Sequence, residues 1–245
     1  MSSRIEDYAL IGDCETAALV SKEGSIDWLC WPRFDSGACF AALLGDANNG
    51  HWRIAPVAAG ADAIARVRRR YRPATLILET ELTIAGVGEV VVIDFMPLRK
   101  TRSWSQLVRL VVGKSGVVPM HMELIVRSGY GAFAPWVTRS ETGDLLAIAG
   151  PDMLLLRTPV ALRGEGMTTV GDFSVSAGQR TPLVLTYVPS HLALPEAVDA
   201  DESLRYTQEF WRSWASACRS PPSRFPVVSR QAHDEEKRRW TSSRA

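Results

Sequence analysis

Short runs of alternating apolar and polar residues, separated by turns rich in glycine and proline, make up most of this chain. Residues 17–20 and 26–31 are two such runs, and the polar stretch 21–25 between them predicts a β-hairpin. Residues 75–84 and 89–95, joined by a glycine-rich turn, predict a second hairpin. This alternation is typical of antiparallel strands that bury one face.

A third hairpin is predicted from strands at residues 106–112 and 117–126, with a turn at 113–116. Both strands are apolar on two sides, which is typical of the interior of a two-layer structure. Further short strands are predicted at residues 51–54, 63–71, 145–148, 153–157, 169–175 and 183–188. So many strands with almost no helix between them predict an all-β fold, a large two-layer antiparallel β-sandwich.

One helix is predicted near the end of the chain, over residues 201–218. Trp211 and Trp214 are spaced as neighbours on one helix face, and Asp199 or Asp201 can cap the first turn. Each tryptophan buries a large area when it packs. We therefore expect both rings to dock the helix on the sandwich, in preference to stacking on a sugar.

Composition and charge narrow the class of protein. Hydrophobic residues make up 46% of the 245 residues and charged ones 22%, which fits a soluble globular chain with a substantial core. The net charge of +1 provides no overall field that would recruit nucleic acid or an anionic membrane. No apolar run approaches the ~20 residues of a membrane span, and no export signal is recognisable, so a cytoplasmic location is expected.

The sequence has no recognisable metal or nucleotide motif. The four cysteines are Cys14, Cys30, Cys39 and Cys218. They lack the spacing of a zinc site, so buried free thiols are favoured over a metal site or disulfides. The four histidines are scattered, and the glycine pairs lack the strand-to-helix context of a phosphate loop. We expect neither a metal nor any other cofactor.

The segment from Tyr8 to Pro56 has a specific resemblance to a known family. It contains IGDCETAALVSKEGSIDWLCWPRFDSGACFAALLGD followed by GHWRIAP, and RSGYGAFAP, GPDMLLLRTPVAL and FWRSWASAC follow in the same order. The chain resembles the trehalase-like N-terminal domain that precedes the catalytic barrel in bacterial glycoside hydrolase family 15, the glucoamylase and trehalase family. The resemblance covers residue 5 to about residue 218. It implies a large β-sandwich and the beginning of a linker helix.

This resemblance divides the chain into three parts. Residues 1–198 are expected to form the trehalase-like β-sandwich, and residues 199–218 the linker helix. Residues 219–245 contain prolines and a charged run, and they do not match the start of the family's (α/α)6 barrel. We expect a disordered or aberrant tail, from a coding sequence that is truncated or shifted in frame near Ser220.

No catalytic residue is assigned. Inverting glycosidases need two carboxyl groups ~6.5–9.5 Å apart, and in the family both belong to the barrel, so this chain is expected to be inactive alone. Asp13 and Asp27 are interpreted as turn or structural residues. Asp35 with Ser36 precedes a helical pattern at Phe40 and is a good N-cap signal.

The loop that begins at Trp31 is the best candidate site, because Pro32 ends the preceding strand and places polar groups at a rim. Trp31 or Phe34 could stack on the face of a sugar. Arg33 and Asp35 could hydrogen-bond its vicinal hydroxyls. In the alternative that we favour, Arg33 and Asp35 pair with each other or with the neighbouring barrel and hold an interdomain contact.

Two functions therefore remain open. The first is a non-catalytic N-terminal domain of a family 15 enzyme acting on α-glucosides, packed against the catalytic barrel. The second is an autonomous carbohydrate-binding or partner-binding module. The expected partners are the barrel and an α-glucoside, with no nucleic acid and no membrane. A domain that evolved against a barrel should expose an apolar patch and self-associate when alone.

Overall fold

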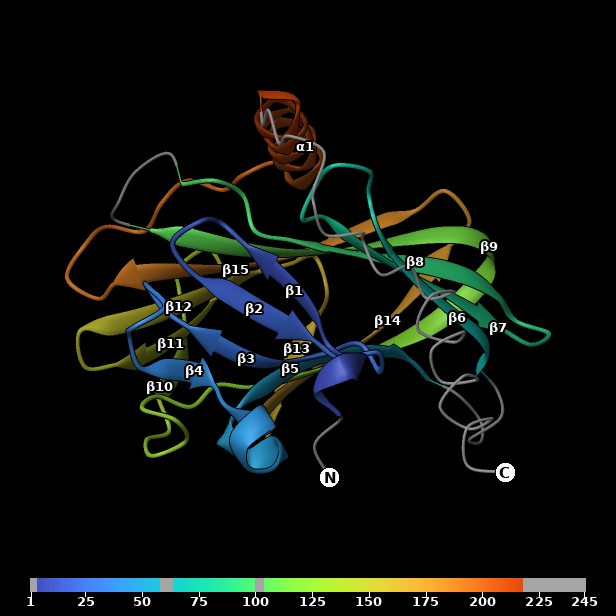
Figure 1. Ribbon diagram of the computed structural model, residues 1–245. Coiled ribbons are helices and arrows are strands. Elements are labelled where there is room, and N and C mark those ends of the chain that lie inside the picture. The colour runs from blue at the N-terminus through green and yellow to red at the C-terminus, as the bar shows by residue number, and fades with distance from the viewer. Residues whose placement is uncertain (1–3, 58–63, 100–103, 218–245) are drawn as a thin grey trace, which may run out of the picture. The chain divides into compact units, whose positions relative to one another are not determined.

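The computed structural model describes residues 4–57, 64–99 and 104–217 (Figure 1). The chain divides into two compact units, residues 1–212 and 213–245. Every strand among the described residues belongs to the first unit, and the described part of the second is the end of the C-terminal helix. The predicted tail, residues 219–245, lies outside the described residues.

The described residues are mostly strands. The strands are β1 (Ala9–Gly12), β2 (Ala17–Val20), β3 (Ser25–Cys30), β4 (Ala38–Phe40), β5 (His51–Pro56), β6 (Ile64–Tyr71), β7 (Leu78–Ile84), β8 (Gly88–Phe95), β9 (Ser105–Ile125), β10 (Trp136–Arg139), β11 (Leu145–Ala149), β12 (Asp152–Arg157), β13 (Leu162–Glu165), β14 (Thr168–Ser176) and β15 (Arg180–Pro189). The helices are the 3-10 turns η1 (Ile5–Asp7), η2 (Ala42–Leu44) and η3 (Ala47–Asn49), and the α-helix α1 (Ala200–Ala217). The predicted all-β fold with a C-terminal helix is confirmed.

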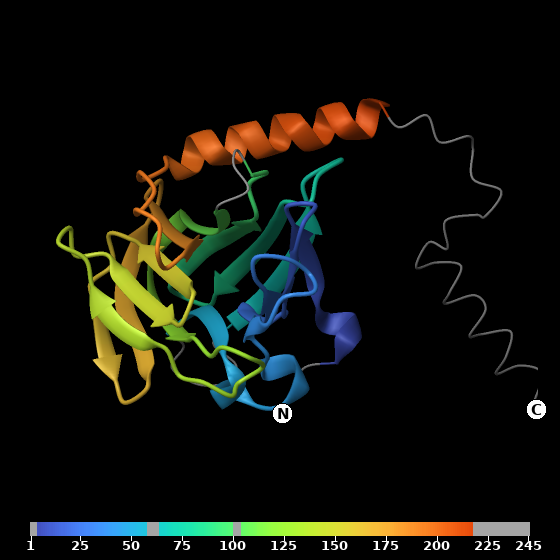
Figure 2. The ribbon, with the colours of Figure 1, turned by 90° about the vertical axis from the view of Figure 1, so that its left-hand side faces the viewer.

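All strand pairs with a described register are antiparallel, and they form two layers joined through β9 (Figures 1 and 2). The first half of β9 pairs with β8 and β15, and its second half pairs with β5 and β14. One layer therefore contains β1 to β5 with β13 and β14, and the other contains β6 to β8, β10 to β12 and β15. The main hydrophobic cluster takes residues from both layers and fills the space between them.

The third predicted hairpin is wrong, because β9 is one continuous strand of 21 residues. The glycines at its centre permit close approach to neighbouring strands instead of a chain reversal. A Cβ on Gly113 would lie 2.0 Å from the carbonyl oxygen of Ser176, and one on Gly116 would lie 2.0 Å from that of Val87. Gly116 has φ of 65°, and the register with β8 shifts between Ser115 and Gly113, as at a β-bulge.

A charged residue lies inside the core and links the two layers. Arg109 of β9 is fully buried and donates to the carboxylate of Asp94 at 2.8 Å. It also donates to the carbonyl oxygens of Trp52, at 2.6 Å, and Gly24, at 2.8 Å, both from the opposite layer. The buried guanidinium is therefore paired and hydrogen-bonded, as a charge in a protein core must be.

Helix α1 is capped by Asp199, whose Oδ1 accepts the backbone N–H of Glu202 at 2.8 Å. Its first turns pack Ala200 and Leu204 on a second hydrophobic cluster, on the outer face of β8, β9 and β15 (Figure 2). Trp211 is buried, as predicted, but the prediction for Trp214 is wrong because 56% of that residue is exposed.

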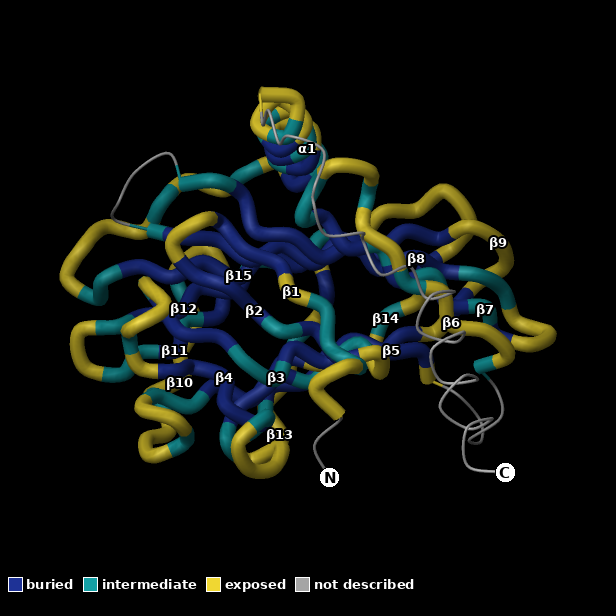
Figure 3. The backbone as a smooth tube through the Cα atoms, viewed as in Figure 1, coloured by how far each residue is buried: buried dark blue, intermediate teal, exposed yellow. Residues whose placement is uncertain are grey.

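Buried positions concentrate in the strands, and the connecting loops are mostly exposed (Figure 3). The helical turn predicted over Phe40 to Leu44 is confirmed only for η2 (Ala42–Leu44), because Phe40 itself lies in β4, pairs with Leu29 and is fully buried. Burial of the ring in the core outweighs the weak helical pattern of this segment. No helix in the described parts of the chain is long and apolar enough to cross a membrane.

Candidate functional site

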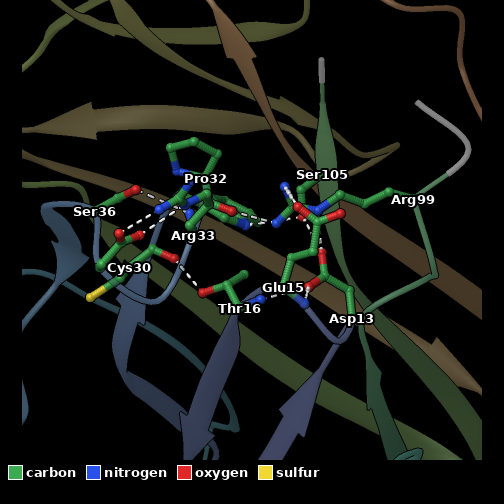
Figure 4. Close-up of polar contacts among 11 residues, drawn as sticks. Asp13, Glu15, Thr16, Cys30, Pro32, Arg33, Ser36, Arg99 and Ser105 are labelled. Carbon is green, nitrogen blue, oxygen red and sulfur yellow. Dashed lines mark hydrogen bonds and ion pairs between the residues drawn. The ribbon is translucent and has the colours of Figure 1, made fainter. Parts of the chain in front are cut away.

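The predicted site loop connects β3 to β4 and is closed by its own hydrogen bonds (Figure 4). The backbone N–H of Arg33 donates to Ser36 Oγ, and the N–H of Ser36 donates to the Arg33 carbonyl oxygen, both at 3.1 Å. The N–H of Phe34 donates to the carbonyl oxygen of Glu15 at 3.1 Å. These bonds hold the loop against the turn between β1 and β2.

A buried carboxylate anchors this end of the molecule (Figure 4). Asp13 Oδ2 accepts Arg99 Nε at 2.7 Å and Ser105 Oγ at 2.8 Å, while Oδ1 accepts the N–H of Thr16 at 2.8 Å. The Asp13 side chain is fully buried and that of Arg99 is 5% exposed. The turn role predicted for Asp13 is confirmed by its hydrogen bonds to the backbone of Glu15 and Thr16. The same carboxylate also connects this turn to Arg99 and to Ser105 of β9.

The loop is attached directly to this anchor. Arg99 donates a further hydrogen bond to the carbonyl oxygen of Pro32, and the indole Nε1 of Trp31 donates to Ser105 Oγ at 3.1 Å. Because Asp13 binds both Arg99 and Ser105, one carboxylate fixes the start of the loop at two points. The loop is therefore positioned by buried contacts and not by its exposed residues.

Arg33 and Asp35 pair with each other. Arg33 Nε donates to Asp35 Oδ1 at 2.9 Å, and a second guanidinium nitrogen donates to Oδ2. The hydrogen bonds from Arg33 hold the pKa of Asp35 below its ordinary value. The side chains are 63% and 68% exposed, so this is a surface pair. The predicted N-cap role of Asp35 is wrong, because β4 follows it and the next helical turn, η2, begins only at Ala42.

Trp31 and Phe34 have opposite environments. Trp31 is 3% exposed, and its ring centroid lies 6.3 Å from that of Tyr187. With Tyr187 and Asp152 it lines a cavity of about 50 Å³, which is too small for a sugar ring. Phe34 is 62% exposed. The structure therefore places three of the four predicted residues at the surface and the fourth in the supporting core.

A second loop, between β9 and β10, adjoins the first. The N–H of Tyr130 donates to the carbonyl oxygen of Ala38 at 3.3 Å, and its ring centroid lies 6.0 Å from that of Trp28. The two loops and the start of β10 expose four aromatic residues, which we call the aromatic rim. They are Phe34, Tyr130, Phe133 and Trp136, exposed by 62%, 49%, 67% and 74%.

Sequence reasoning missed three members of the rim. The segment RSGYGAFAP, which contains Tyr130 and Phe133, was informative only as part of the family resemblance. An aromatic residue in a loop has no strand or helix period to mark it. The available signal was the concentration of rings in a glycine-rich connection, where no element can bury them.

The arrangement suits binding better than acid–base catalysis. A glycosidase needs a general acid whose pKa is raised, whereas the pKa of Asp35 is lowered by Arg33. Within the described residues, no three side chains among histidine, cysteine, aspartate and glutamate are placed to hold a metal ion. An exposed aromatic surface on a rigidly anchored base is typical of a contact with another protein surface.

Comparison with known families agrees with the fold. A model described as "Trehalase-like, N-terminal" matches residues 1–201. This chain belongs to the trehalase-like N-terminal family. The family's expected β-sandwich is the fold described above, so the resemblance noted in the sequence is confirmed.

Curated relatives of this trehalase-like domain are enzymes named trehalase. The one from Mycolicibacterium smegmatis is 30% identical over 234 residues, covering 86% of this chain and 34% of the relative. The one from Mycobacterium tuberculosis is 30% identical over 236 residues, covering 86% of this chain and 33% of the relative. The chain thus spans about a third of the length of these relatives and matches their N-terminal part.

Among solved structures, a putative kojibiose phosphorylase from human microbiome aligns with 86% of this trehalase-like domain and 33% of its own chain. The TM-score is 0.35 and the sequence identity is 6%. These values are too low to bear on fold or function.

Proposed function

We propose that this chain is the non-catalytic N-terminal domain of a family 15 glycoside hydrolase that acts on α-glucosides, and that it docks against a catalytic (α/α)6 barrel through the aromatic rim. The observation that carries the proposal is the rim itself. Four large rings are exposed on two adjoining loops and the start of β10, and the first of these loops is fixed by the buried Asp13–Arg99 ion pair. Exposed apolar surface on a rigid support marks an interaction site.

The length of the relatives supports a separate catalytic part. This chain spans about a third of the trehalases from the two mycobacteria. Domains of one chain are held together by interfaces that resemble transient protein–protein contacts. The barrel of an intact family enzyme is therefore the partner that we propose for the rim.

In this proposal the Arg33–Asp35 pair orients the barrel at the edge of the rim. A guanidinium and a carboxylate offer several hydrogen-bonding directions with little net charge. The pair is preformed by two hydrogen bonds, so docking does not have to order it. Contact with an α-glucoside at the barrel mouth is the competing role for these two residues.

Two further properties belong to the same proposal. Cys30 and Cys39 are buried free thiols, which fits a cytoplasmic location, where thiols stay reduced. Without a barrel, the exposed rings of the rim are expected to drive self-association. Sedimentation over a wide concentration range that shows only monomer would oppose this expectation.

The proposal is tested by assaying the purified chain on trehalose, maltose and starch oligomers, with the Mycolicibacterium smegmatis trehalase as positive control on trehalose. We expect no hydrolysis above background, because the two catalytic carboxyl groups of the family belong to the barrel and Arg33 holds the pKa of Asp35 below its ordinary value. Activity that follows the protein through purification and disappears in an Asp35→Ala variant would place catalysis in the sandwich and overturn the proposal.

A further inference from the structure

A cavity of about 360 Å³ lies between the start of β9 and the segment that leads into α1. Its walls come from residues 97–98 after β8, the start of β9, residues 196–199 and the first two turns of α1. Sites for small molecules usually have volumes of ~300–1,000 Å³. The cavity shares no residue with the aromatic rim.

Two aromatic side chains contribute to the walls. Trp104, just before β9, is half-buried, and Tyr206 of α1 is 45% exposed. Both present apolar ring surface beside polar groups. Rings of this kind stack against flat ligands that have an apolar face.

The floor includes a buried amide. Gln106 is 4% exposed, and it lines both this cavity and a neighbouring one of about 180 Å³. The Gln106 side chain makes a long hydrogen bond, from Nε2 to Thr186 Oγ1 at 3.4 Å. A buried amide has two donors and two acceptor sites to satisfy. The side chain therefore brings to the cavity wall an amide that can both donate and accept hydrogen bonds.

The mouth of this cavity has both hydrogen-bond acceptors and hydrogen-bond donors. Glu196 and Glu202 contribute exposed carboxylates, and Ser203 contributes a hydroxyl. Asp199 is already engaged as the helix cap through Oδ1. A ligand therefore meets acceptors at the mouth and an amide that both donates and accepts at the floor.

We propose that this cavity binds a neutral saccharide through one pyranose ring. The apolar face of the ring stacks on Trp104 or Tyr206, and its hydroxyls, which both donate and accept, match Gln106 and the carboxylates. An organic cation fits less well. The carboxylates are exposed and screened by solvent, the positive end of the α1 dipole opposes a cation, and the donors of Gln106 would face it. This proposal does not rest on the docking role of the rim.

The experiment titrates the ¹⁵N-labelled chain with maltose, with D-glucose and, separately, with spermidine, while the tryptophan indole resonances are observed. Trp104→Phe assigns the resonance of that residue. We expect maltose and glucose to shift it with a dissociation constant in the millimolar range. Tyr206→Ala, an exposed helix position where alanine is well tolerated, should weaken binding roughly tenfold. Trp136→Ala, in the aromatic rim, is the matched control and should leave the affinity unchanged.

Each other result overturns the proposal. No shift of the Trp104 resonance by either saccharide would leave the cavity without this ligand. Binding that is lost in Trp136→Ala but kept in Tyr206→Ala would move the site to the rim. A response to spermidine alone would make it a cation site. The aromatic rim and the cavity are tested by different variants. A failure of the saccharide proposal therefore leaves the docking proposal intact, and a failure of the docking proposal leaves the saccharide proposal intact.

Discussion

Asp13 is the residue on which the loop end of the sandwich depends most. Its buried carboxylate accepts hydrogen bonds from two backbone N–H groups, from Arg99 and from Ser105. Without it, the partners of Arg99 among the described residues would be the Pro32 carbonyl oxygen and Glu15, whose side chain is 44% exposed. An unpaired charge left in a buried position is far more costly than the loss of a surface pair.

We therefore predict that Asp13→Ala lowers the free energy of unfolding by about 3–5 kcal/mol. Asp35→Ala removes a carboxylate of the same type from an exposed pair a short distance away and serves as the control. Its denaturation midpoint should match that of the unsubstituted chain. Urea denaturation of both variants measures the difference, and equal losses would show that the Asp13 network does not support the loop.

Glu79 gives the stability a defined dependence on pH. Burial acts to raise its pKa, but hydrogen bonds from Arg72 and Arg70 outweigh this and hold the pKa below the ordinary value of 4.5. A lowered pKa means that the folded state favours the charged form. The contribution is therefore present above the ordinary pKa and is lost as the pH falls through the lowered value.

The matched substitution is Glu79→Gln, which keeps the shape and removes the charge. We predict that this variant is less stable than the unsubstituted chain at neutral pH and that the difference shrinks steadily below about pH 4.5. Thermal unfolding at a series of pH values provides the measurement. A difference that stays constant into strongly acidic buffer would mean that the ion pairs with Arg70 and Arg72 contribute nothing.

At the scale of elements, β9 determines how the two layers are joined. Its two halves pair with strands of different layers, and the change takes place around Gly113 and Gly116. Both glycines allow neighbouring backbone to approach more closely than a Cβ permits. Both layers therefore depend on the absence of side chains at these two positions.

Gly116→Ala should consequently destabilise the chain by several kcal/mol, through a clash with the Val87 carbonyl oxygen as well as a strained φ. Gly86→Ala is the control, since Gly86 has φ of 70° but nothing within 4 Å of an added Cβ. The free energy of unfolding of Gly86→Ala should fall by about 1 kcal/mol, which is the cost of the left-handed backbone alone. Similar midpoints for the two variants in urea would contradict the close approach at β9.

The same region shows what the sequence could and could not predict. Alternation identified most strands, because it reflects burial of one face. It did not distinguish a turn at residues 113–116 from a bulge, since glycine serves both. The hydrogen-bond network of Asp13 that supports the site loop could not be predicted from the sequence either, because Arg99 and Ser105 lie 86 and 92 positions from Asp13 along the chain. The loop itself was found through Pro32 and its charged neighbours, but its aromatic partner loop was not.

At the scale of the whole protein, two observations together support a docking role for this domain. The chain belongs to the trehalase-like N-terminal family and spans about a third of its trehalase relatives. The loop end exposes four aromatic rings and a preformed pair between Arg33 and Asp35. A surface of this kind serves as a docking face more readily than as a catalytic centre.

The most direct test of the docking claim is a chimera in which this chain replaces the N-terminal third of the Mycolicibacterium smegmatis trehalase. Arg33→Ala in that chimera is compared with Arg163→Ala, a control at another exposed arginine paired with carboxylates. Docking predicts that Arg33→Ala lowers the Tm while the KM for trehalose stays unchanged, and that the control changes neither. An unchanged Tm with a KM raised by the equivalent of about 1–3 kcal/mol would contradict the account and place Arg33 at the substrate.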